Sequence, residues 1–134
     1  MIQNRSIPAC TVIPVLTYPD INAAVEWLCT TFGFTLRLRI GNHRAQLNVG
    51  DGALVVAEGV VVGGDTVMVR VSDVDSHYAR TLKHGARIVG APMVQPYGEN
   101  QYSVEDFACR RWTFSESVAD VAPQDWGGEV GQLK

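Results

Sequence analysis

The feature that most constrains the fold is an internal repeat of one strand-helix unit. The segment VLTYPDINAAVEWLCTTFGF, residues 15–34, is similar to VMVRVSDVDSHYARTLKHGA, residues 67–86, and the comparison matches Asp20 with Asp73 and Gly33 with Gly85 at nearly equal separations. An aspartate before an apolar helical pattern and a glycine after it predict where a helix begins and ends. Because a repeated supersecondary unit buries its apolar face against its twin, we expect two similar modules that fold together.

Each predicted helix is followed by short strands. In the first half these are TLRLRI, RAQLNVGDG and ALVVAE, and in the second half RIV, QYSVE and RRWTF. Both halves therefore read β-α-β-β-β, which gives an α+β protein whose two modules form a curved sheet around a cleft, with the helices on the outer face. The expected boundaries are 8–60 for the first module, 65–115 for the second and 116–134 for a C-terminal tail, all within a single domain of 134 residues.

Period-two alternation assigns side chains to the two faces of each strand. Val67, Val69 and Val71 suit the helix-covered face, as do Trp112 and Phe114 of the last strand. The opposite face, which we expect to line the cleft, then receives Arg44, Gln46 and Asn48 from the first module and Thr66, Met68, Arg70, Arg111 and Thr113 from the second. In the first strand the same choice turns Ile13, Val15 and Thr17 toward the cleft.

The formal charge of -3 offers no broad basic surface, which argues against nucleic acid and anionic membranes as partners. No apolar run approaches the length of a membrane span, and no signal-peptide core is seen at the start, so we expect a cytoplasmic protein. The three cysteines lack paired spacing, which favours free thiols. Cys109, in a predicted turn, is the one to test for reactivity.

Four segments in this order resemble the vicinal-oxygen-chelate superfamily, the fold of glyoxalases, bleomycin-resistance proteins and dioxygenases, and in particular its glyoxalase-like branch. They are IPVLTYPDINAAVEWLCTTFGF, AQLNVGDGALVVAEG, VSDVDSHYARTLKHGARIV and QPYGENQYSVEDFACRRWTF. The resemblance implies paired βαβββ modules around a cleft, commonly in a homodimer. In its last hairpin the family usually has Asp-Pro-x-Gly where this chain has DFAC, Asp106 to Cys109, so we expect a different turn geometry there.

The resemblance also implies where a divalent metal would be held. Carried over by position, the ligand sites fall at Ile13, near Val56 or Glu58, at Thr66 and at Thr113, and of these only Glu58 could ligate a metal. Catalytic metal sites normally use about three protein ligands, so no metal site and no cofactor is expected. Of the three histidines, His77 and His84 are expected on the solvated face of the second helix, outside the cleft, whereas His43 lies beside a strand edge from which it could reach the cleft.

The remaining candidates are a carboxylate, an arginine group and aromatic rings. Glu58 either faces the cleft as a base or cation-binding group, or ends an edge strand in water. Arg44, Arg70 and Arg111 are either an anion pocket or separate surface residues. Tyr97 and Tyr102 are candidates for stacking on a ligand.

Three functions remain open from the sequence. The first is a metal-independent protein that binds a small molecule, such as an antibiotic or a metabolite, in the cleft. The second is a metal-dependent glyoxalase-like lyase or dioxygenase. The third is a dimeric scaffold with a vestigial cleft. No nucleophile-base pair and no glycine-rich phosphate loop is evident.

Overall fold

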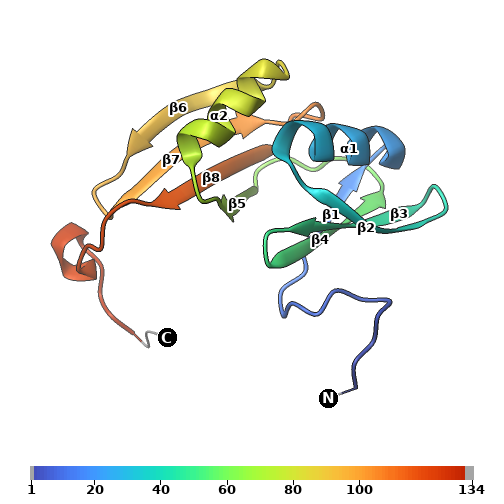
Figure 1. The fold of residues 1–134 in the computed structure, drawn as a ribbon, viewed down its shortest axis with the longest axis horizontal. Helices are drawn as coiled ribbons and strands as arrows, with labels where there is room; N and C mark the ends of the chain where they lie inside the picture. The colour runs from blue at the N-terminus through green and yellow to red at the C-terminus, as the bar shows by residue number, and fades with distance from the viewer. Residues whose placement is uncertain (1, 132–134) are drawn as a thin grey trace.

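A computed structural model describes residues 2–131 (Figure 1). Its strands form two four-stranded sheets. Sheet A has the order β1-β4-β3-β2 and is built from Val15–Tyr18, Thr35–Ile40, Arg44–Val49 and Gly52–Glu58 for β1 to β4. Sheet B has the order β5-β8-β7-β6 and contains Thr66–Arg70, Arg87–Val94, Glu99–Glu105 and Arg111–Ser117 for β5 to β8. In each sheet the first strand of the module pairs in parallel with the last, and the other pairs are antiparallel.

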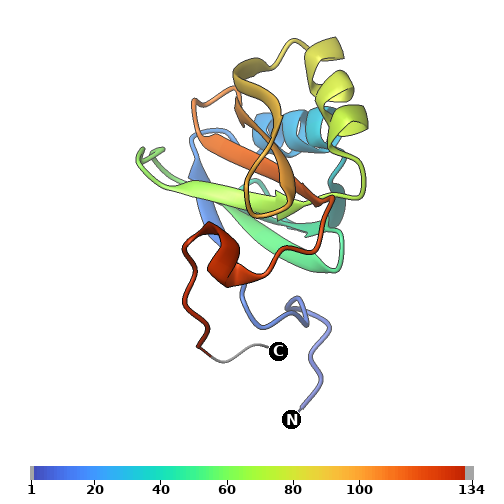
Figure 2. The ribbon, with the colours of Figure 1, turned by 90° about the vertical axis from the view of Figure 1, so that its left-hand side faces the viewer.

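The predicted βαβββ modules are therefore confirmed. Over residues 2–131 the strands make two separate sheets, and no strand pairing joins them into one. Helix α1 (Ile21–Trp27) belongs to the first module and α2 (Val74–Lys83) to the second. Both lie on the same side of the molecule, above the sheets, whereas the first and last residues that the structure describes lie on the opposite side (Figures 1 and 2).

The helix ends follow the sequence signals. The Asp20 side chain accepts a hydrogen bond from the backbone N–H of Ala23, and Asp73 accepts one from Ser76. Gly33 and Gly85 both have positive φ, the left-handed conformation in which glycine ends helices at little cost. The first helix differs from expectation in its last part, because residues Leu28–Phe32 form a π-helix, η1, rather than continuing as α-helix.

One hydrophobic core joins the two modules. Phe32 of η1 packs edge-on against Trp112 and Phe114 of sheet B, with ring centroids 5.3 and 4.9 Å away. The same ring contacts Phe34 and Trp27 of its own module at 5.7 and 5.0 Å. The helix-covered faces of both sheets thus share their buried side chains, and the opposite faces are left for other contacts.

The guanidinium of Arg80 on α2 ties the two helical segments together. It donates to the carbonyl oxygens of Thr30, at 3.0 Å, and of Cys29, at 3.4 Å, both in η1. These carbonyls lie near the end of a helical segment, where backbone acceptors lack partners within the helix. The cross-module contact supplies a donor to the Thr30 carbonyl and a second donor to the Cys29 carbonyl, which also accepts the N–H of Gly33 at 3.1 Å.

His77 corrects an expectation about α2. It is not solvated: its Nε2 lies 2.9 Å from the carbonyl of Phe32 and its Nδ1 lies 2.5 Å from the hydroxyl of Tyr102. A carbonyl can only accept, so Nε2 carries the proton and the neutral ring accepts from Tyr102 at Nδ1. Burial lowers the pKa of His77 below its ordinary value of 6.5.

Candidate functional site

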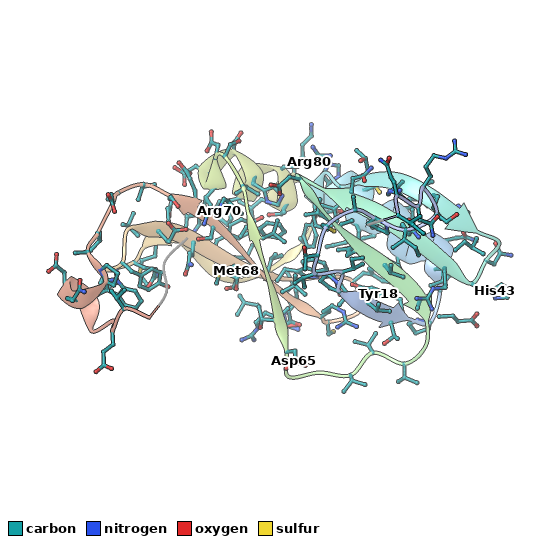
Figure 3. The ribbon with its side chains drawn as sticks, turned by 90° about the horizontal axis from the view of Figure 1, so that it is seen from below. Tyr18, His43, Asp65, Met68, Arg70 and Arg80 are labelled. Carbon is teal, nitrogen blue, oxygen red and sulfur yellow. The ribbon has the colours of Figure 1, made fainter. Side chains whose placement is uncertain are left out.

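The face of sheet B turned away from α2, which we call the open face of sheet B, carries a series of polar side chains. It contains the predicted residues Met68, Arg70, Arg111 and Thr113, as expected from alternation along β5 and β8. Met68 is 62% exposed. Met68 and Arg70 both lie on β5 in the view from below (Figure 3).

Cross-strand pairs on β7 and β8 complete this face. Glu99 is opposite Ser117, Gln101 is opposite Ser115 and Ser103 is opposite Thr113. The Ser115 hydroxyl donates to Glu99 Oε1 at 2.7 Å and accepts from Gln101 Nε2 at 3.0 Å, and the hydroxyls of Ser103 and Thr113 lie 3.0 Å apart. The side-chain oxygens and nitrogens thus form a ladder of hydrogen bonds across the sheet.

Arg70 ends the ladder on the β5 side. Its guanidinium donates to the Ser117 hydroxyl at 2.5 Å and lies 3.9 Å from Glu99 Oε1. The hydroxyl of Ser117, then that of Ser115 and the charge of Arg70, lower the pKa of Glu99 against the opposing effect of burial. The Glu99 carboxylate is therefore ionised near neutral pH and balances the charge of Arg70, at an end of the face that is rich in hydrogen-bonding groups.

Tyr97 extends the ladder toward the C-terminal tail. Its hydroxyl donates to Gln101 Oε1 at 2.9 Å, and its ring packs against Trp126 with centroids 5.0 Å apart. Trp126 belongs to the short 3-10 helix η2 (Pro123–Trp126) of the tail. The tail thereby contacts the same end of sheet B as the polar ladder.

A groove lies at the seam where the two sheets meet. Its volume is about 270 Å³, and it is lined from sheet B by Met68 and Arg70 and from the first module by Val12, Pro14 and Ala53. Apolar and polar groups therefore adjoin at β5, the arrangement typical of small-molecule sites.

The three first-module residues predicted for the cleft lie on sheet A. Arg44 is exposed, Asn48 donates to the Thr35 hydroxyl at 3.3 Å, and Gln46 is only 4% exposed. Arg44 adjoins His43, which lies at the far end of the sheet A hairpin from Arg70 (Figure 3). Arg44 therefore does not join Arg70 and Arg111 in one anion pocket, and that interpretation is wrong for the single chain.

Two predicted site residues are on the wrong face. Tyr102 is 2% exposed, packs on the core rings of Phe114 and Tyr78, and bonds to His77. Burial raises the pKa of Tyr102 to about 12, so its hydroxyl remains a neutral donor. Gln101 and Ser103, its neighbours along β7, face the open side, so alternation applied to this strand would have placed Tyr102 in the core.

Glu58 is the second predicted site residue that lies on the wrong face. It ends β4 in register with the buried Tyr18, on the helix-covered side, and its side chain is 61% exposed beside His43, whose Nδ1 is 3.6 Å from Glu58 Oε2. The position of Glu58 along β4 therefore turns its side chain away from the cleft face. Glu58 thus ends its strand in water, as in the second of the two interpretations that the sequence left open.

The described residues do not assemble a metal-binding cluster. Within 2–131, no group of three or more His, Cys, Asp or Glu side chains is placed to hold an ion. The positions at which the resemblance puts ligands carry Thr66 and Thr113 on the open face of sheet B, where hydroxyls replace imidazole and carboxylate. The donor set does not fit a catalytic divalent metal.

The turn between β7 and β8 is organised by Asp106, whose carboxylate is buried. Its Oδ2 accepts from the Tyr18 hydroxyl at 2.7 Å and from Trp112 Nε1 at 3.0 Å, and its Oδ1 accepts from the backbone N–H groups of Ala108 and Arg110. Burial, followed by the Asp106 charge, raises the pKa of Tyr18 far above its usual range. The contact fixes the second module's last hairpin to the first strand of the first module.

Two neighbours complete this turn. Cys109 takes a positive φ of 65°, the left-handed conformation usually given to glycine. Phe107 stacks on Tyr18 with ring centroids 5.7 Å apart, on the side of the helices rather than over the polar ladder, because it also packs against Trp27 of α1.

Comparison with solved structures identifies the family. TioX from Micromonospora sp. ML1 is 34% identical, with a TM-score of 0.71, over 84% of this chain and 100% of that one. A glyoxalase/bleomycin resistance protein/dioxygenase from Nocardioides superposes with a TM-score of 0.65 at 20% identity, covering 94% of this chain and 91% of that one. The chain belongs to the vicinal-oxygen-chelate superfamily.

A lactoylglutathione lyase from Agrobacterium tumefaciens shares the vicinal-oxygen-chelate fold, with a TM-score of 0.68 at 17% identity over 81% of this chain and 94% of that one. No protein-family model matches the sequence, and the search of curated proteins finds no match. Among residues 2–131 no helix is long and apolar enough to cross a membrane.

Proposed function

We propose that this vicinal-oxygen-chelate protein is a metal-independent binder of a small organic molecule, of the bleomycin-resistance type, which sequesters an antibiotic or a metabolite. The observation that supports the proposal is the polar ladder on the open face of sheet B beside the seam groove. Hydroxyl, amide and guanidinium groups there can exchange their hydrogen bonds for those of a polar ligand, while Met68 and Ala53 offer apolar contact.

Two ion pairs on this face, beside the further guanidinium of Arg111, leave a small net charge, which favours a neutral or zwitterionic ligand over a polyanion. Arg70 is paired with Glu99, and Arg87 lies 3.9 Å from Glu105 on the neighbouring strands. A free anion would have to compete with these carboxylates for the guanidinium groups. The ligand we expect therefore presents carbonyl, hydroxyl or amide groups and an apolar surface.

We further propose that the working form is a homodimer. Both β1 and β5 are edge strands, and they present Val15, 54% exposed, and Met68, 62% exposed. Unpaired strand edges with apolar side chains favour association with another chain. A second copy placed along these edges would extend the surface available to a ligand.

The experiment is thermal unfolding of the metal-stripped protein with a panel of aromatic and amide-containing natural products and with nickel, manganese and zinc ions. An organic ligand present at a hundredfold its dissociation constant should stabilise the protein by about 2.7 kcal/mol. Arg70→Ala should abolish that shift, whereas Lys83→Ala, on the exposed face of α2, should preserve it.

Stabilisation by a metal ion, lost on chelation, would contradict metal independence and favour a glyoxalase-like lyase or dioxygenase. No response to any organic compound would instead favour a scaffold role. Size-exclusion chromatography with light scattering tests the dimer, for which we expect twice the chain mass of 14.6 kDa.

A further inference from the structure

The chain's own N-terminal segment, Asn4 to Pro8, lies against the face of sheet A that is turned away from α1, which we call the open face of sheet A and which carries Gln46. Gln46 Nε2 donates to the carbonyl of Ser6 at 2.9 Å. This contact accounts for the burial of Gln46, which alternation along β3 had assigned to the cleft. The position expected for a ligand is therefore already occupied by part of the same chain.

Arg37 of β2 supplies the other donors. Its Nη2 lies 2.9 Å from the carbonyl oxygen of Arg5 and 3.3 Å from that of Ile7. Its Nη1 donates to Gln46 Oε1 at 2.5 Å, so the two side chains hold each other in place. Leu36 is in register with the core residue Leu47, so alternation along β2 turns its neighbour Arg37 to the opposite face, the side of Gln46.

The segment is held by its backbone rather than by its side chains. A turn, in which the N–H of Ile7 bonds the carbonyl of Asn4 and the N–H of Ser6 bonds the Asn4 side chain, points three successive carbonyl oxygens at Arg37 and Gln46. The residues that bear these carbonyls, 5, 6 and 7, are all exposed. Arg37 and Gln46 therefore bind closely spaced carbonyl oxygens without regard to the side chains between them.

We propose that Arg37 and Gln46 form a binding site for the amide carbonyls of a peptide-like ligand, and that residues 4–8 occupy this site as an internal competitor. The proposal rests on the proposed small-molecule-binding function, because it assumes that a ligand uses the open faces of both sheets. Apart from the buried Pro8, the segment leaves its side chains in solvent, so its release should cost little compared with unfolding of the domain.

Trypsin cleavage after Arg5 measures release of the segment in the full chain, because the carbonyl of Arg5 is one of the bound groups. Intact-mass spectrometry identifies the product that has lost residues 1–5. Replacing Arg37 or Gln46 by alanine should speed this cleavage about tenfold, since each change removes one or two hydrogen bonds. The matched control is Arg39→Ala: Arg39 is on the same strand, contacts Asn22 and does not contact the segment.

N-acetyl-triglycine amide, which carries successive amide carbonyls and no side chains, is the ligand probe. At millimolar concentration it should accelerate cleavage after Arg5 in the wild-type chain and in Arg39→Ala, and have no effect in the double variant Arg37→Ala, Gln46→Ala. An unrelated trypsin substrate in the same tube should be cleaved at a constant rate, which excludes an effect on the protease.

Equal cleavage of wild type and Arg37→Ala would overturn the occupied-site proposal, and so would protection that disappears on dilution, because a partner copy would then cover the segment. Protection without any response to the triglycine amide would overturn the carbonyl-binding role. If binding of natural products at Arg70 fails but the cleavage results hold, the proposed function has failed and the N-terminal occupant stands.

Discussion

At the scale of single residues, the Asp106 side chain connects the two modules. One buried carboxylate serves two side-chain donors from different modules and two backbone N–H groups of its own turn. The neighbouring Arg110 guanidinium lies over the Tyr18 ring, 5.1 Å from its centroid, and bonds the carbonyl of Thr17 at 3.0 Å. These contacts make the last hairpin part of the module junction.

Asp106→Ala should lower the free energy of unfolding by about 3 kcal/mol, because it leaves buried donors without an acceptor. Urea unfolding followed by tryptophan fluorescence measures the change. The exposed Asp120 provides the control, and Asp120→Ala should shift stability by no more than about 0.5 kcal/mol. A comparable loss in both variants would show that the carboxylate network is not the cause.

His77 gives the fold a dependence on pH. Its pKa in the folded state is below 6.5, so near and below that pH the unfolded chain binds more protons than the folded one. The stability contributed by the neutral ring is complete above the unfolded pKa and is lost as pH falls through the folded pKa. Unfolding midpoints should therefore decrease between about pH 7 and pH 5.

His77→Gln should be less stable at neutral pH but should depend less on pH across this window, as measured by urea titrations at several pH values. His84→Gln serves as the control because His84 is exposed, and it should retain the wild-type slope. An unchanged slope in His77→Gln would assign the pH dependence to other groups.

At the scale of elements, the turn 106–109 replaces the Asp-Pro-x-Gly pattern of the vicinal-oxygen-chelate superfamily without a glycine. Cys109 itself adopts the left-handed conformation, at φ 65°, and its N–H donates to the carbonyl of Asp106 at 2.9 Å. A non-glycine residue is strained there, by about 1–2 kcal/mol for a regular left-handed geometry.

Cys109→Gly should therefore stabilise the protein by about 0.5–1 kcal/mol, the relief of strain less the added flexibility of the unfolded chain. Cys109→Ala removes the thiol but keeps the strain, so it should give no stabilisation. Differential scanning calorimetry of the three proteins distinguishes the two causes. Equal midpoints for the glycine and alanine variants would refute the conformational explanation.

At the scale of the whole molecule, the shared core should make the two modules unfold together. Phe32→Ala removes the ring that contacts Trp112 and Phe114 across the junction and should cost about 3–5 kcal/mol. Fluorescence and far-ultraviolet circular dichroism should still report one transition. Phe107→Ala should cost less, since Phe107 is 43% exposed. Two separated transitions in the wild type would contradict the single core.

The sequence by itself determined the module order, both helix starts and the faces of β5 and β8, because capping and period-two alternation are local properties of the backbone. Tertiary packing decided which groups lie against each face. Alternation placed Gln46 on an open face but could not show that residues 4–8 cover it, since that contact depends on where a segment about 40 residues away in the chain folds back.

The same reason explains why the orientation of Glu58 stayed open and why the predictions for Tyr102 and His77 were wrong. Packing between elements that are distant in sequence sets all three environments. It decides which face the end of β4 turns to at Glu58, which group the buried Tyr102 hydroxyl bonds, and what covers the α2 surface at His77. The polar ladder was predictable in part. Alternation determines which residues share the face, whereas the register of β7 against β8 determines which of them form hydrogen bonds. Local periodicity therefore fixed which residues can share a face, and tertiary packing fixed which faces are free to bind.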